Sequence, residues 1–196
     1  MTSAHNGQRR HGRPFLLAAA VLLVGLVDEL VRLTGWDVWQ WLVAAGLAVA
    51  VGLHHVASIL EGRARRTVRV LTVIAAVGAG LYLGATVSFL AADAVDLRLP
   101  TPLQGLFMVG ALSLLGGVVL ATVGIGDAMV RRGAGTRGTG WLVVLVGVLF
   151  LSPVPALLAV DVPEAIPLAG VAALAVVLAV LGTRTGHAVR GGAGDG

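Results

Sequence analysis

Six apolar stretches, each long enough to cross a lipid bilayer, occupy most of this chain. A hydrocarbon core about 30 Å thick needs roughly 20 apolar residues in a helix, because an α-helix rises about 1.5 Å per residue. The expected helices are 14–33, 38–60, 70–92, 103–130, 141–160 and 166–182. Short connections favour antiparallel neighbours, so the sequence predicts an all-α, polytopic membrane protein built from three antiparallel helical hairpins.

Arginine is concentrated in alternate connections between these stretches. One side holds Arg9, Arg10, Arg13, Arg63, Arg65, Arg66, Arg69, Arg131, Arg132, Arg137, Arg184 and Arg190. The other side holds only Arg32 and Arg98. Cytoplasmic loops carry an excess of Lys and Arg, so we expect both termini in the cytoplasm. The clusters also favour contact with anionic lipid at the cytoplasmic face of the bilayer.

The chain is expected to form one membrane domain with two short tails. The tails are 1–13 and 184–196, both cytoplasmic, and the transmembrane domain is 14–183. The first apolar stretch follows a basic segment and therefore also fits a cleaved signal peptide. No small-residue cleavage site follows it, so we expect it to remain as a span.

Composition excludes several classes of protein. Only 12% of residues are charged, against about 25% in soluble proteins, and 57% are hydrophobic. The arginines lie beside spans, where membrane lipid accounts for them, so we expect no nucleic-acid partner. Cysteine and lysine are absent, which excludes disulfides, thiolate metal sites and Schiff-base chemistry. We expect no cofactor and no metal. Arginine without lysine indicates GC-rich coding, and therefore a prokaryotic plasma membrane.

The side opposite the arginine clusters is expected to be acidic and aromatic. It holds the acids Asp28, Glu29, Asp37, Asp93, Asp96, Asp161 and Glu164. Trp36, Trp39 and Trp41 gather at the start of the second stretch, where an interfacial aromatic belt is typical.

Asp28 and Glu29 are the most costly residues if they lie within hydrocarbon. Arg32 follows four residues after Asp28 and three after Glu29, so it can pair with either on one helix face. An interfacial ion pair is one interpretation. A cation or proton site that faces the bundle interior is the other.

His54 and His55 lie near the cytoplasmic end of the second stretch. Neighbouring helix positions point about 100° apart, so at most one of them can face a shared site. A hydrogen bond to a carbonyl or headgroup is the simplest role, and pH sensing or a metal site are the alternatives.

The fifth stretch is interrupted by Ser152, Pro153, Val154 and Pro155. Each proline removes a backbone donor and clashes with a preceding carbonyl, so the helix should kink or unwind there. Such breaks form ion sites in transporters, but a plain kink relieved by Ser152 also accounts for the pattern.

Small residues spaced by four predict where the helices pack closely. Hydrophobicity cannot drive one span onto another in lipid, but close backbone approach at small side chains can. The candidate ladders are Ala44, Ala48 and Gly52; Gly80 and Gly84; and Ser113 and Gly117.

Gly140, Trp141 and Leu142, followed by Gly147, Val148 and Leu149, open the fifth stretch. These residues and the six-span plan resemble the HdeD-type acid-resistance membrane proteins. Ser152 departs from the glycine pattern of that family. The resemblance implies a membrane component with a role in acid stress.

No catalytic or phosphate-binding motif is present: the chain lacks a lysine-containing phosphate loop, His-Glu-x-x-His and Gly-x-Ser-x-Gly. We therefore expect a small integral membrane protein without enzymatic activity, either an accessory or assembly component or a stress-related one. It would act as a homo-oligomer or within a membrane complex. The alternative is a small cation or proton transporter or channel that uses Asp28, Glu29 and the break at Pro153 and Pro155.

Overall fold

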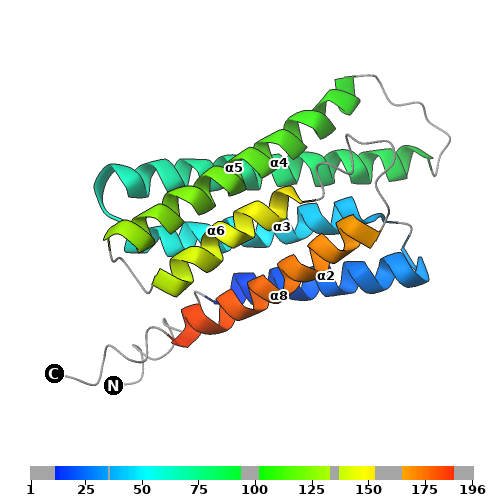
Figure 1. Cartoon of the computed structure of the whole chain (residues 1–196). Coiled ribbons are helices and arrows are strands. Elements are labelled where there is room, and N and C mark those ends of the chain that lie inside the picture. Colours follow the sequence, from blue (N-terminus) through cyan, green and yellow to red (C-terminus); the bar gives the residue numbers. More distant parts are fainter. Residues whose placement is uncertain (1–11, 35, 94–101, 133–136, 153–164, 188–196) are drawn as a thin grey trace, which may run out of the picture.

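The computed structural model describes residues 12–34, 36–93, 102–132, 137–152 and 165–187, and these residues form helices and turns without a strand (Figure 1). The helices are α2 (Arg13–Val31), α3 (Val38–Val56), η1 (Ala57–Ile59), α4 (Gly62–Asp93), α5 (Pro102–Arg132), α6 (Arg137–Leu151) and α8 (Ala165–His187). The all-α class is therefore confirmed.

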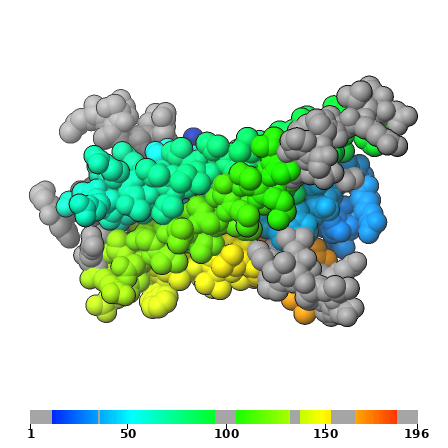
Figure 2. Space-filling model, turned by 90° about the horizontal axis from the view of Figure 1, so that it is seen from above, coloured from blue at the N-terminus to red at the C-terminus, as the bar shows by residue number. Residues whose placement is uncertain are grey.

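The helices form a closed bundle in which each packs on the next along the chain and α8 returns to α2 (Figure 1). The contact between α4 and α5 is the most extensive, and Figure 2 shows α4, α5 and α6 as one continuous face. Helix α3 lies at the centre: 61% of an apolar 18-residue stretch of it is buried, against 33% of the corresponding stretches of α2, α4, α5 and α8. A bundle of this kind buries its middle helix and leaves one face of each outer helix exposed.

That exposed surface is apolar. Leu30, Val77 and Val176 are among many large aliphatic side chains that are more than half exposed on the bundle. Soluble monomers do not expose apolar surface of this extent, because water penalises it. Within the described part of the chain, five helices are also long and apolar enough to cross a membrane: α2, α3 with η1, α4, α5 and α8. The fold fits a membrane protein.

The helix ends differ most from the expected ones in two places. The expected loop over residues 61–69 is wrong, because α4 begins at Gly62 and carries its arginines on the helix itself. Arginine is a good helix former, and Gly62, with φ of +59°, provides the turn into the helix. The fifth span was expected over 141–160. Here α6 ends at Leu151, and residues 153–164 lie outside the described part of the chain.

Contacts between helix ends define two ends of the bundle. Val68 at the start of α4 lies against Gly124 near the end of α5. Gly12 before α2 lies against Gly182 near the end of α8, and Gly138 at the start of α6 lies against Arg184. These contacts bring the arginine-bearing helix ends together. We call this the arginine end, and the opposite end, where α2 stops, the Asp28 end.

Close packing of α4 on α5 takes place at glycine. A Cβ built on Gly78 would lie 2.7 Å from the carbonyl oxygen of Gly110, and one built on Gly110 would lie 2.7 Å from that of Gly78. Gly117 meets the backbone of Leu71 and Ala75 in the same way. The absence of side chains therefore lets the two backbones touch, as in other tightly packed membrane helices.

The expected ladder at Gly80 and Gly84 is wrong for this bundle. Both glycines are exposed, and a Cβ on either would meet nothing within 4 Å. Gly78 lies two residues earlier, about 200° around the helix from Gly80, so it faces α5 instead. Ala48 and Gly52 are buried as the pattern predicts, with Gly52 against Phe15. Ala44 and Ser113 are half-buried.

Candidate functional site

Asp28 organises the turn that joins α2 to α3. Its side chain is only 3% exposed. One carboxylate oxygen accepts from the backbone amides of Leu33 (3.1 Å) and Thr34 (2.9 Å). The other accepts from the Thr34 hydroxyl (2.5 Å) and the indole N–H of Trp41 (3.0 Å). Both oxygens are therefore engaged twice, and the carboxylate fastens the end of α2 to the start of α3.

The residues beside Asp28 have different roles from the expected ones. Arg32 adopts a left-handed conformation, with φ of 53°, and its amide donates to the Asp28 carbonyl. The expected ion pair is not formed: within residues 12–34, Arg32 pairs with neither Asp28 nor Glu29. Glu29 is half-buried. Trp41, expected only as part of an interfacial belt, is a direct partner of Asp28. Trp41 lies 13 residues after Asp28, in the next helix, so no local sequence pattern indicates this contact.

The next connection, at the other end of α3, is also fixed by polar groups. The Nδ1 atom of His54 lies 3.0 Å from the hydroxyl of Thr72, which in turn donates to the carbonyl of Arg69 (2.9 Å). Because that hydroxyl has one hydrogen, the arrangement requires His54 to donate through Nδ1. His54 thus ties α3 to α4. His55 is exposed.

Arg65 completes that connection. Its guanidinium donates to the carbonyls of Leu60 (2.7 Å) and Ser58 (2.5 Å). These carbonyls belong to the end of η1 and the turn after it, where helical partners are missing. Arg65 therefore serves as a side-chain cap for the chain that enters α4. The sequence grouped it with the topology-setting arginines and gave no sign of this second role.

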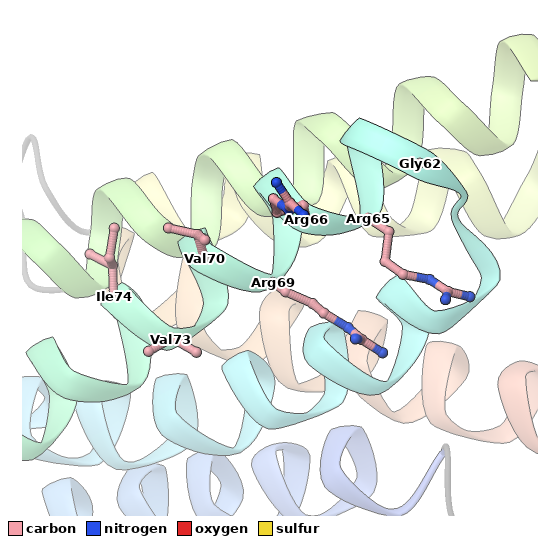
Figure 3. Close-up of a pocket in the computed structure, with 7 residues that line it drawn as sticks. All are labelled: Gly62, Arg65, Arg66, Arg69, Val70, Val73 and Ile74. Atoms are coloured by element: carbon pink, nitrogen blue, oxygen red, sulfur yellow. The ribbon is translucent and has the colours of Figure 1, made fainter.

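Arg66 and Arg69 are different. Both side chains are exposed, and neither makes a hydrogen bond or an ion pair with another described residue. Together with Gly62, Arg65, Val70, Val73 and Ile74 they line a groove of about 550 Å³ along the first part of α4 (Figure 3). We call it the arginine groove. Arg131, by contrast, is paired with Asp127 on α5.

An apolar cavity of about 370 Å³ lies between α3, α4, α5 and α6 toward the Asp28 end. Four aromatic side chains contribute to its wall: Trp39, Tyr82, Phe107 and Phe150. Tyr82 and Phe107 meet edge to face, with ring centroids 5.0 Å apart. The polar side chains at the wall are those of Asp37 and Tyr82. The cavity has room for a small apolar molecule, but little to orient a reaction.

The expected break in the fifth span is described only at its first residue. Ser152 donates its hydroxyl to the carbonyl of Leu149 (2.7 Å) and lies against Gly170 of α8. Pro153 lies outside the described residues, as do Arg9 and Arg10. Arg13 and Arg63 are exposed at the arginine end, and the side chain of Arg132 is not described.

No family model, curated protein or solved structure matches the chain. The resemblance to HdeD-type proteins gains no support from these comparisons. The described residues also contain no group of three His, Asp or Glu side chains placed to hold a metal ion. Function must therefore be argued from the polar groups themselves, which divide into those held by the fold, such as Asp28, and those left free, such as Arg66.

Proposed function

We propose that the chain is an integral protein of a prokaryotic plasma membrane, with the arginine end in the cytoplasm. It has no enzymatic activity and acts as an accessory, assembly or stress-related component, alone as a homo-oligomer or with membrane partners. The observation that carries this proposal is the state of Asp28. The buried acid best suited to chemistry has both oxygens engaged by the turn that follows it and by Trp41 of α3.

The polar groups of α3 and α4 support the same interpretation. His54, a candidate for pH sensing or metal binding, is engaged with Thr72, and Arg65 is engaged with two carbonyls, so both of these polar side chains hold helix ends together. The exposed surface, in turn, is apolar and matches lipid or the face of another membrane protein. A protein whose polar groups hold its own helices, and whose exposed surface is apolar, acts by contact with lipid or with other membrane proteins.

A cation or proton carrier built on Asp28 is the weaker alternative. A carrier residue must release its partners to take up an ion, and Asp28 would have to give up four hydrogen bonds within a tight turn. Glu29 has no such restraint among the described residues and is the better candidate in that scheme.

The topology is tested by cysteine labelling, for which the cysteine-free chain is well suited. Glu61 and Asp93 are both exposed and lie at opposite ends of α4. With an impermeant thiol reagent on intact cells, we expect Asp93→Cys to be labelled and Glu61→Cys to be labelled only after permeabilisation. The reverse pattern would place the arginine end outside.

The role itself is tested by native mass spectrometry of protein gently extracted from its own membrane. We expect a defined assembly, with further copies of the chain or other polypeptides in fixed stoichiometry. In parallel, liposomes that contain the protein should pass protons and monovalent cations no faster than empty ones. A cation flux that Glu29→Gln abolishes would favour the carrier instead.

A further inference from the structure

The arginine groove is polar at one end and apolar at the other. Its side chains form two parallel rows along α4: Arg66, Val70 and Ile74 in one, and Arg65, Arg69 and Val73 in the other (Figure 3). Residues four apart share a helix face, so each row begins with cations and ends with aliphatic side chains. From Arg66 to Ile74 the groove rises about 12 Å along the helix.

The aliphatic part of the groove faces away from the bundle. Val70, Val73 and Ile74 are 53%, 52% and 44% exposed, whereas Ala75 on the opposite side of the helix is fully buried. Val77, the next residue along this face, is also exposed. The apolar trough therefore continues toward the middle of the expected span.

The cationic part has two guanidinium groups with unused donors. Arg65 is already held by the carbonyls of Leu60 and Ser58. Arg66 and Arg69 have no such partner among the described residues, and Glu61, the nearest acid along the chain, forms no ion pair with them. Guanidinium donors bind phosphate oxygens in a fork geometry, so two free arginines about one turn apart match a single phosphate.

We propose that this groove binds one anionic phospholipid of the inner leaflet, with its phosphate between Arg66 and Arg69 and an acyl chain along Val70, Val73 and Ile74. The inference rests on the proposed membrane placement, since the end of a span in the cytoplasmic leaflet meets both anionic headgroups and acyl chains. A free phosphate would satisfy the arginines but leave the aliphatic side chains uncovered. The groove has a cationic part and an aliphatic part, and both need a partner. A lipid fits the whole groove.

The test compares phospholipids on the intact, full-length protein. Protein is reconstituted in vesicles of equimolar phosphatidylglycerol and phosphatidylcholine, extracted gently, and its retained lipid is counted by native mass spectrometry. We expect wild type to retain phosphatidylglycerol preferentially. Each of Arg66→Gln and Arg69→Gln should lower the preference about fivefold, the loss expected when one charge-assisted hydrogen-bonded contact to the phosphate is removed, and the double variant should abolish it.

Two controls separate a groove from general attraction. Arg63→Gln removes the same charge at the same end of α4, outside the groove, and should leave most of the preference intact. Equal losses for Arg63→Gln and Arg66→Gln would overturn the proposal. Val70→Ser with Val73→Ser removes aliphatic contact and should shorten lipid retention without changing the charge.

Other outcomes also decide the question. Displacement of the lipid by inorganic phosphate would identify an anion site without a lipid and would overturn the inference. If the protein inserts into the membrane but shows no lipid preference, the lipid site is refuted and the proposed membrane placement still holds. Failure of the protein to insert, seen in vesicle flotation, would instead refute the placement. The variants should melt as wild type does, since neither guanidinium has a described partner.

Discussion

The two faces of α4 meet different surroundings. Toward the bundle, Ala75 and Ala79 are fully buried and Gly78 touches the backbone of α5. On the outward face, Val73 and Val77 are more than half exposed, and a Cβ on Gly80 would meet open space. Small residues make the close contacts of the inward face, whereas the outward face carries branched aliphatic residues beside Gly80, with arginines at its start.

The difference shows that burial, and not hydrophobicity, distinguishes the two faces of a helix in this bundle. Both faces are apolar, so the small residues mark the protein side and the large ones mark the side available to lipid. Polar groups follow the same division. Thr72 on the inner face is engaged with His54, whereas Arg66 on the outer face has no described partner.

The largest effect is expected when Gly78→Leu is compared with Gly80→Leu. A Leu at Gly78 must displace the backbone of Gly110 and Leu114, both 2.7 Å from the new Cβ. We expect a loss of more than about 3 kcal/mol in unfolding free energy, because overpacking here meets backbone and not a flexible side chain. Leu at Gly80 should be nearly neutral. Thermal unfolding in detergent measures both.

Gly78→Ala extends the series if the Leu variant does not fold. It should also destabilise, by about 1–3 kcal/mol, since even one methyl group cannot fit without separating the helices. Equal melting temperatures for the Gly78 and Gly80 variants would contradict the packing of α4 on α5.

A second pair of variants, at Asp28 and Glu29 of α2, compares a side chain that is engaged in hydrogen bonds with a neighbour that is not engaged among the described residues. Asp28→Ala leaves the amides of Leu33 and Thr34 and the indole of Trp41 without their acceptor. The loss of four hydrogen bonds to a buried carboxylate is costly, so we expect the melting temperature to fall by more than about 5 °C. Glu29→Ala should change it little. If Asp28→Ala melts as wild type does while Glu29→Ala does not, the roles of the two acids are reversed.

How far the sequence predicted these features depends on whether the signal is local. Helix formation and lipid compatibility come from long apolar runs, so they were expected correctly. The packing face of α4 was not, because Gly78, Gly80 and Gly84 all occur in one short segment, and only Gly110, far along the chain, decides which of them is buried. The four-residue spacing favoured Gly80 and Gly84, which are exposed in this bundle.

The same limit applies to the candidate site. The sequence indicated that Asp28 needs a partner, and Arg32, one helical turn later, was the partner that spacing suggested. The structure provides Thr34 and Trp41 instead, because the turn folds back and brings α3 against α2. Partners within one helix can be deduced from spacing, whereas partners across a turn need the geometry of the turn.

A third comparison separates Arg65 from Arg66, neighbours in sequence with opposite roles. Arg65→Gln removes donors from the carbonyls of Leu60 and Ser58, so we expect a loss of about 1–2 kcal/mol in stability. Arg66→Gln should have no measurable effect on stability. Detergent melting curves of the two variants give the answer, and a destabilised Arg66→Gln would indicate a partner for that side chain within the fold.

The smallest expected effect concerns Thr72, with the exposed Thr67 on the same helix as its control. Thr72→Val keeps the shape of the side chain but removes the hydroxyl that joins His54 to the Arg69 carbonyl. We expect a loss of about 1 kcal/mol, because His54 is half-buried and can recover part of its bonding from water. Thr67→Val should be neutral. Histidine ring NMR provides an independent readout: the Nδ1–H signal of His54 should be protected from exchange in wild type and in Thr67→Val, but not in Thr72→Val. Equal exchange in all three would mean that His54 does not link α3 to α4, and the inner face of α4 would then hold its neighbours by packing alone.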